Sequence, residues 1–163
     1  MKNIILIGMP GAGKSTVGVL LAKKLLMSFT DTDLIIQNQY GKPLCDILKA
    51  HGKQEFIRME SEVLRSLEIC DSVIATGGSA VYTEEAMRHL KQNGITVYLK
   101  LSSDEIKERI DNLSTRGIAM DNGETLDDIF TERAPMYEKY ADITICCSGL
   151  SAGQCADKIA ESL

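Results

Sequence analysis

Residues 8–15 read Gly8-Met9-Pro10-Gly11-Ala12-Gly13-Lys14-Ser15, and the rest of the chain is best interpreted from this stretch. It matches the pattern G-x-x-x-x-G-K-[ST] and lies between an apolar run at 3–7 and a run of helical periodicity at 14–27. A glycine-rich turn between a strand and a helix directs backbone N–H groups and the positive end of the helix at one spot. The pattern therefore predicts a loop that binds the phosphates of a nucleoside triphosphate.

Two side chains of this loop have separate predicted tasks. Lys14 is expected to reach the β- and γ-phosphates, and the Ser15 hydroxyl is expected to bind Mg²⁺. The sequence has no N-K-x-D segment to read a guanine base, and it is too short for a large mechanical ATPase. We therefore expect a kinase that uses ATP and passes a phosphoryl group to a small acceptor. The other loop residues expected to bind ATP are Gly11, Ala12, Gly13 and Thr16.

Outside the loop, strand-like and helix-like patterns alternate. Five short apolar runs predict strands at 3–7, 28–30, 73–76, 95–101 and 143–147. Helical periodicity and capping signals predict helices at 14–27, 34–40, 44–51, 54–69, 83–92, from 102 onward, 124–140 and 153–163. Short apolar strands between helices form parallel sheets that are covered on both faces. We therefore expect an α/β fold, a doubly wound five-stranded parallel sheet flanked by helices, in one domain over residues 1–163.

Composition limits the possible partners. With 18 Lys and Arg against 23 Asp and Glu, the net charge is −5, whereas a protein that wraps nucleic acid needs a basic face. The first apolar run is too short for a signal peptide or a membrane span. The five cysteines form no C-x-x-C pair and are expected to be small buried residues in a reducing compartment. We expect a cytoplasmic monomer with no nucleic-acid partner and no membrane partner.

Two carboxylates follow the second predicted strand, Asp31 and Asp33. We expect the end of this strand to lie beside the phosphate loop that follows the first strand, because ligands in doubly wound sheets bind beyond the carboxyl ends of the strands. One carboxylate can then hold Mg²⁺ through water, and the other can accept a hydrogen bond from the acceptor hydroxyl and activate it. The alternative is that an aspartate caps the following helix, and the two roles are compatible.

With these motifs together, the chain resembles the shikimate kinase family, a branch of the P-loop kinases with a nucleoside-monophosphate-kinase-like fold. The resemblance spans essentially the whole chain. It implies a five-stranded parallel sheet, an acceptor-binding segment at about 33–60, and a polar, mobile lid at about 112–123 that closes over ATP. The residues that carry the resemblance are 8–16, Asp31-Thr32-Asp33, Phe56, Glu60, 75–78, Arg109, Arg116, Arg133, Tyr137-Glu138 and Tyr140-Ala141-Asp142.

On the nucleotide side, the resemblance implies that Lys14 and Ser15 serve the phosphates and Mg²⁺, and that Asp31 assists the metal through water. Arg109 is implied to stack on adenine. Arg116, in the lid, is implied to neutralise charge on the transferring phosphoryl group and so to act in catalysis. Without the resemblance, each of these arginines would be interpreted as a solvated surface charge.

On the acceptor side, the resemblance implies that Asp33 binds and activates the acceptor hydroxyl. The glycine turn at Gly77 and Gly78 is implied to bind the acceptor, with a backbone N–H of Gly78 as donor. Arg133 is implied to pair with the carboxylate of the acceptor. We therefore expect the acceptor to carry an anionic group.

Three positions depart from the family pattern, and all concern the acceptor or the lid. The family has the segment Phe-Arg-x-x-Glu, whose arginine grips the carboxylate of shikimate, but this chain has Ile57 at that position. Arg58 is the nearest substitute, although one helical residue turns its side chain by about 100°. Ser79 replaces the third glycine of the turn, and Gly117 replaces the proline after the lid arginine.

The resemblance implies phosphorylation of shikimate to shikimate 3-phosphate, and the altered positions leave two alternatives open. One is a kinase for another small anionic hydroxy compound. The other is a nucleotide-dependent regulatory protein with degenerate catalysis. Loss of one bidentate arginine predicts shikimate binding that is roughly 10–150-fold weaker than in a relative with both arginines.

Overall fold

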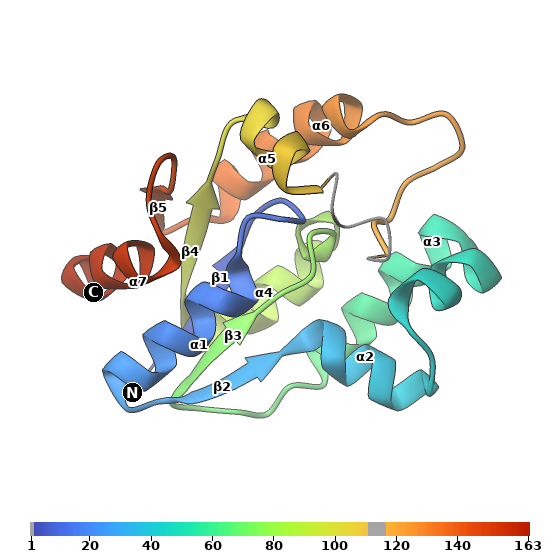
Figure 1. Cartoon of the computed structure of the whole chain (residues 1–163). Coiled ribbons are helices and arrows are strands. Elements are labelled where there is room, and N and C mark those ends of the chain that lie inside the picture. Colours follow the sequence, from blue (N-terminus) through green and yellow to red (C-terminus); the bar gives the residue numbers. More distant parts are fainter. Residues whose placement is uncertain (1, 111–116) are drawn as a thin grey trace.

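The computed structural model describes residues 2–110 and 117–163. Five strands form one sheet in the order β2-β3-β1-β4-β5, and every neighbouring pair is parallel (Figure 1). This arrangement confirms the predicted α/β fold with a five-stranded parallel sheet. The strands are β1 (Asn3–Ile7), β2 (Ser28–Asp31), β3 (Ser72–Ala75), β4 (Gly94–Lys100) and β5 (Ile143–Cys146).

Helices cover both faces of the sheet. On one face α1 packs against α7, and on the other α4 and α6 lie behind β4, with α3 packed on α4 (Figure 1). The described helices are α1 (Lys14–Leu25), α2 (Thr32–Tyr40), α3 (Leu44–Arg65), α4 (Glu84–Gln92), α5 (Ser103–Ile110), α6 (Leu126–Tyr140) and α7 (Ala152–Ser162), with a short 3-10 helix η1 (Ala80–Tyr82).

The strand order shows how Asp31 and Asp33 come to lie beside the phosphate loop. β3 lies between β1 and β2 and pairs with both. Ala75 of β3 is opposite Leu6 of β1 on one side and opposite Asp31 of β2 on the other. The carboxyl ends of β1, β3 and β2 therefore lie side by side, and residues that follow all three strands meet at one edge of the sheet.

Residues 44–65 contain both of the helices predicted in this region. The sequence predicts a break at Gly52, and the structure confirms it: α3 consists of two helical segments joined by a kink, where Gly52 has φ 77° and ψ 169°, outside the helical region. Only glycine adopts this backbone region without strain, so the residue sets the angle between the two segments. The other predicted glycine break is confirmed, because Gly41 is the left-handed C-cap of α2.

Buried apolar residues of the described chain form two clusters. The larger one lies between the sheet and its helices and includes the apolar side chains of β1, β3 and β4. The smaller one lies between α2 and α3 and comprises Ile36, Ile47, Phe56, Met59, Val63 and Ala119. The segment expected to bind the acceptor thus has a small core of its own.

The lid expected at about 112–123 is described only in its second half. Residues 112–116 lie outside the described residues, but Ala119 is buried in the smaller core. Gly117 packs against the backbone of α3, where an added Cβ would come within 2.7 Å of the Leu44 carbonyl carbon. Gly117 and Ala119 therefore pack against the rest of the protein, whereas residues 121–123 are exposed, and closure of a lid over ATP stays a prediction.

The cysteines match their predicted surroundings only in part. Cys147 and Cys155 are buried, but Cys45 is half-buried, and Cys70 and Cys146 are exposed. Cys146 and Cys147 point to opposite sides, as expected for neighbours at the end of a strand. No helix among the described residues has the length and apolar character needed to cross a membrane.

Candidate active site

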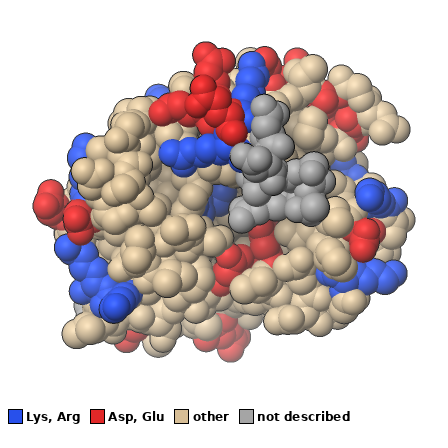
Figure 2. All heavy atoms as spheres, viewed as in Figure 1, with Lys and Arg blue, Asp and Glu red and all other residues tan. Residues whose placement is uncertain are grey.

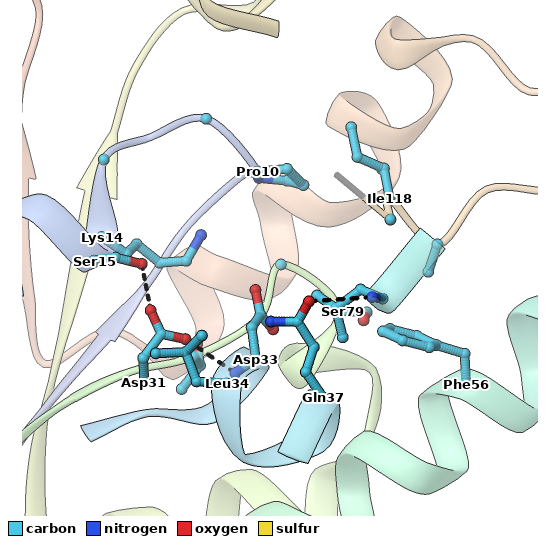
Figure 3. A pocket seen from close by; sticks show the side chains of 18 of the residues that line it. Pro10, Lys14, Ser15, Asp31, Asp33, Leu34, Gln37, Phe56, Ser79 and Ile118 are labelled. Atoms are coloured by element: carbon cyan, nitrogen blue, oxygen red, sulfur yellow. Dashed lines mark hydrogen bonds between the residues drawn. The ribbon is translucent and has the colours of Figure 1, made fainter. Parts of the chain in front are cut away.

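A cavity of about 490 Å³ opens at the edge of the sheet where β1, β3 and β2 end. Figure 3 shows Lys14, Asp31 and Asp33 turned toward this space, with Phe56 and Ile118 on its far side. Figure 2 shows both acidic and basic side chains around the hollow at the middle of this face. Doubly wound sheets bind ligands at this edge, so the cavity is the candidate active site.

The glycine-rich loop forms one end of the cavity. Gly11 and Gly13 have φ values of 81° and 90°, which only glycine adopts readily, and both line the cavity with Thr16. Gly13 also caps α1, whose N-terminus therefore points at the cavity. Ala12 does not line the cavity, because it is buried and its N–H donates to the Met9 carbonyl at 3.1 Å. Ala12, one of the loop residues expected to bind ATP, therefore lies where it shapes the turn of the loop.

Lys14 lies inside this loop. Its Nζ donates to the carbonyl oxygens of Gly8 at 2.7 Å and Met9 at 2.9 Å. Burial lowers the pKa of Lys14 to about 8, while the negative charge of Asp33 opposes the shift. The ammonium is therefore charged at neutral pH and poorly hydrated, which strengthens its attraction for a phosphate group.

Ser15 and Asp31 form a direct pair at the floor of the cavity. The Ser15 hydroxyl donates to Asp31 Oδ2 at 2.6 Å. Asp31 Oδ1 accepts from the backbone N–H of Asp33 at 3.0 Å, so Asp31 also caps α2. The capping role is confirmed, and the same carboxylate faces the cavity. Hydroxyl and carboxylate oxygens are the hard ligands that Mg²⁺ prefers, so this pair fits a magnesium ion.

Asp33 and Glu60 place two carboxylates around the turn after β3. A Cβ on Gly77 would clash with Glu60 Oε1 and lie 2.8 Å from Asp33 Oδ1, so this position requires glycine. Glu60 accepts from the Ser79 hydroxyl through Oε2, while its buried Oε1 has no hydrogen-bond partner among the described residues. Burial and the neighbouring charge of Asp33 raise the pKa of Glu60 to about 7.

Arg133 is the buried cation of the acceptor side. It comes from α6, is 1% exposed, and lines the cavity. Its Nε donates to the Tyr82 hydroxyl at 3.1 Å, and one terminal nitrogen donates to the Ala119 carbonyl at 2.7 Å. The other terminal nitrogen lies 3.1 Å from the position of a Cβ on Gly78. These contacts hold the guanidinium at the cavity wall with one edge toward the glycine turn.

The glycine turn itself is held from two sides. The Tyr137 hydroxyl donates to the Gly78 carbonyl at 2.6 Å, and a Cβ on Gly78 would lie 2.7 Å from Pro10 Cδ. The Gly77 N–H donates to the Thr32 hydroxyl at 3.3 Å, so it is already used within the protein. The Gly78 N–H has no hydrogen-bond partner among the described residues, which leaves it for a ligand.

Arg58 corrects the sequence prediction. It is 55% exposed and forms ion pairs with Glu55 and Glu62 on the outer face of α3, away from the cavity. The physical reason is the helical register, since one residue turns the side chain by about 100° and no bulge compensates. Ile57 is half-buried and is not among the cavity-lining residues. Neither residue replaces the family arginine.

The two remaining predicted arginines differ in what the structure describes. Arg109, near the end of α5, lines the cavity beside the phosphate loop, and its Nη1 lies 3.5 Å from the Ala12 carbonyl oxygen. This places Arg109 at the nucleotide end of the cavity. Arg116 lies outside the described residues.

Gln37 is a cavity residue that the sequence analysis missed. The backbone N–H of Leu44 donates to Gln37 Oε1 at 3.3 Å. Because a backbone N–H can only donate, the amide oxygen faces Leu44, and the amino group is left to the cavity side, next to Asp33 (Figure 3). Its position four residues after Asp33, on the same helix face, is the signal that could have found it.

Comparison with known proteins agrees with this site. The family model for shikimate kinase matches residues 10–163. The shikimate kinase of Thermodesulfovibrio yellowstonii is 36% identical over 162 residues, which cover 98% of this chain and 93% of that protein. The chain belongs to the shikimate kinase family. Solved structures agree, because shikimate kinase from Acinetobacter baumannii, in complex with shikimate, has a TM-score of 0.92 at 33% identity over 99% of this chain and 92% of that one.

A second shikimate kinase, from Aquifex aeolicus, has a TM-score of 0.84 at 32% identity and covers 98% of this chain and 95% of its own. Membership of the shikimate kinase family confirms the predicted resemblance and makes the chain an ATP-dependent kinase. The phosphate loop and the cavity beside it are the parts of the structure that such an activity requires.

Proposed function

We propose that this chain transfers the γ-phosphoryl group of ATP to a hydroxyl of shikimate, giving shikimate 3-phosphate and ADP. One observation carries the proposal: a single cavity joins the phosphate loop to Asp33, Gly78 and Arg133. This chain shares the fold of the A. baumannii shikimate kinase over nearly its full length, and that structure was solved in complex with shikimate. A donor site and an acceptor site in one cavity suit direct transfer between two bound substrates.

The nucleotide end supplies positive charge for the phosphates. The glycines of the loop, the N-terminus of α1 and Lys14 all lie at one end of the cavity. Charge that develops on the β- and γ-phosphates is stabilised by such preorganised donors. Ser15 and Asp31 would hold Mg²⁺, which neutralises phosphate charge when it is bound. Arg109 would contact the adenine, and Arg116 the transferring group.

At the acceptor end, Asp33 would bind the reacting hydroxyl. The hydroxyl oxygen forms the new bond to the γ-phosphorus while the bond from this phosphorus to the β,γ-bridging oxygen breaks and ADP leaves. Asp33 accepts the hydroxyl proton and then returns it to solvent. Its position on the first turn of α2 keeps the carboxylate in a field that favours negative charge.

Arg133 would hold the carboxylate of shikimate, with the Gly78 N–H as a second donor. A single arginine is less than the two that the family pattern provides, because position 57 is isoleucine. This substitution favours a second candidate, a kinase for another small anionic hydroxy compound. Such an acceptor would still need one hydroxyl at Asp33 and one anionic group at Arg133.

Coupled release of ADP tests the proposal. Purified protein with ATP and Mg²⁺ is assayed with shikimate and with a panel of small hydroxy acids, and the product is identified by mass and by NMR. We expect shikimate 3-phosphate, with the Lys14→Ala variant inactive and Lys24→Ala, on the exposed side of the same helix, fully active. Faster turnover of another hydroxy acid than of shikimate would contradict the proposed acceptor. ATP consumption that no acceptor accelerates would contradict the kinase mechanism itself.

A further inference from the structure

A buried lysine on α3 is not among the cavity-lining residues, and the reaction as proposed does not use it. Lys53 follows the kink at Gly52, and its side chain is 6% exposed. We propose that Lys53 is a positioning residue for the acceptor: it fastens residues 117–124, here named the wall segment, to α3 and so holds Arg133 in place. The proposal rests on the proposed function, since it concerns how that acceptor is bound.

Lys53 makes the charged contacts between α3 and the wall segment. Its Nζ donates to both oxygens of Glu124, each at 2.9 Å, and lies 3.3 Å from Asp121 Oδ2. Glu124 in turn accepts from the backbone N–H of Asp121 at 2.7 Å, which closes the end of the segment into a turn. Burial alone would lower the pKa of Lys53, but the hydrogen bonds to Glu124 and Asp121 raise it, so the lysine stays charged.

The wall segment connects this ion pair to the cavity. Gly117, Ile118 and Ala119 line the cavity, and the Ala119 carbonyl accepts from Arg133. Moving the segment would remove that acceptor and leave a buried guanidinium nitrogen without its partner, which is costly. The position of Arg133 therefore depends on where the wall segment lies.

Tyr82 provides a second connection between the same two cations. The Lys53 ammonium lies 5.9 Å from the centre of the Tyr82 ring, and the Arg133 guanidinium carbon lies 5.0 Å from it. The Tyr82 hydroxyl accepts from Arg133 Nε at 3.1 Å. Lys53 and Arg133 thus both contact the Tyr82 ring, and both contact the wall segment. Loss of the lysine therefore loosens Tyr82 and Ala119, the two groups that hold Arg133.

Ile57 lies one turn after Lys53. The two residues are four apart on the regular part of α3, so they lie on one face of the helix. An arginine at position 57, as in the family pattern, would place a second cation on that face. In this chain Lys53 is the cation on that face, and it is bound to the wall segment.

Substitution of the lysine separates a positioning role from a structural one. The variants are Lys53→Met, Lys53→Arg and Glu124→Gln, and Lys49→Met is the matched control, because Lys49 is exposed on α3 one turn before. Hydrogen exchange of the wall segment is measured on the ligand-free protein. Kd for shikimate and KM for ATP are measured separately on the same preparations.

We expect Lys53→Met to speed exchange in the wall segment and to weaken shikimate binding, each by about tenfold, while KM for ATP changes less than twofold. Glu124→Gln should also speed exchange and weaken shikimate binding, but by a smaller factor, because Lys53 keeps its ion pair with Asp121. Lys53→Arg should restore both properties, and Lys49→Met should change neither. Unchanged exchange in Lys53→Met would overturn the proposal, and so would an equal loss of ATP and shikimate binding. A wild-type protein that binds no shikimate would overturn the proposed function alone, because the exchange measurement needs no ligand.

Discussion

Asp31 and Asp33 are two residues apart, yet the structure gives them different surroundings. Asp31 accepts from the Ser15 hydroxyl and caps α2, whereas Asp33 faces the cavity near the glycine turn. We predict that Asp33→Asn lowers kcat by about 10²-fold or more with little change in KM for ATP, because an amide cannot take the hydroxyl proton. Asp31→Asn should instead raise the Mg²⁺ concentration that gives half the maximal rate by about tenfold, because it removes a group that holds the metal through water.

Rates of both variants measured across a series of Mg²⁺ concentrations test this division. Asp46→Asn, exposed in the first turn of α3, is the control and should match the wild type at every concentration. If the two variants gave the same Mg²⁺ profile, the separate roles of the aspartates would be refuted.

Glu60 makes the stability of the protein depend on pH. Its pKa is about 7 in the folded state because of burial and of Asp33, against 4.5 as the ordinary value. Between these values the folded state holds a proton that the unfolded state has lost, so stability falls as pH rises toward and through 7. The wild type should therefore lose unfolding free energy from pH 5 to pH 8, while Glu60→Gln, which cannot ionise, should not lose it. We predict that the stability of Glu60→Gln relative to the wild type is about 2 kcal/mol more favourable at pH 8 than at pH 5.

Urea unfolding at the two pH values measures the difference. The exposed Glu108→Gln variant, on α5, is the control and should track the wild type at both. A Glu60→Gln variant whose relative stability is the same at pH 5 and pH 8 would show that Glu60 ionises normally in the folded protein.

At the level of helices and strands, most of the fold could be predicted because the signals are local. The glycine-rich turn, the apolar runs of the strands and the capping box at Ser102 and Glu105 are all within a few residues of the elements they define. The position of β3 between β1 and β2 could not be predicted, because strand order depends on pairing between distant segments. The break at Gly52 could be predicted, because glycine is a local signal, whereas the angle between the two segments of α3 depends on their packing against α2 and α4.

The candidate site shows the same limit. Residues of the phosphate loop and Asp33 could be predicted, because their function follows from a short pattern after a strand. The prediction of Arg58 at the acceptor was wrong, because the helical register turns its side chain to the outer face of α3. The support of Arg133 by Tyr82 and Ala119 has no local signal, because the three residues come together from η1, the wall segment and α6.

The kink and the C-cap glycine of neighbouring helices make a matched pair of tests. Gly52 has φ 77° and ψ 169°, and Gly41 has φ 65° and ψ 24°, and neither has an atom within 4 Å of an added Cβ. The cost of alanine is therefore purely conformational. We predict that Gly52→Ala lowers the unfolding free energy by about 2–3 kcal/mol and Gly41→Ala by about 1 kcal/mol. Chemical unfolding of both variants measures the two costs, and equal costs would contradict the assignment of strain to the kink.

Position 57 decides how α3 contributes to the acceptor site. Ile57 is half-buried one turn after Lys53, so an arginine there would bring a second cation to the same helix face. We predict that Ile57→Arg lowers KM for shikimate by about tenfold, less than a full bidentate pair provides, because Lys53 repels the new charge. Ile57→Met, neutral and similar in size, should give no gain. An unchanged KM in Ile57→Arg would mean that α3 holds this position too far from the acceptor.

The described residues form two apolar cores of unequal size, and under the proposed function each supports one end of the substrate cavity. The larger core supports β1 and α1, which position the phosphate loop. The smaller core consists of six buried residues from α2, α3 and the wall segment, and it supports the acceptor end of the cavity. Charged side chains of both signs are spread over the face in Figure 2, consistent with a small anionic ligand that is bound inside the cavity.

Unequal cores predict unequal stability within one domain. Segments with fewer buried apolar contacts open at lower free energy than the global transition, so α2 and the first half of α3 should exchange their amide hydrogens faster than β1, β3 and β4. Under the proposed function, shikimate binds where the smaller core meets the larger one, and at 100 times its Kd it should add about 2.7 kcal/mol to the opening of the smaller core. Hydrogen exchange with and without shikimate measures this as roughly 100-fold slower exchange in α2 and α3. ATP should instead slow exchange first in the phosphate loop and in α1. Equal exchange in both cores without ligand, or equal protection of both by shikimate, would mean that the two cores unfold as one unit.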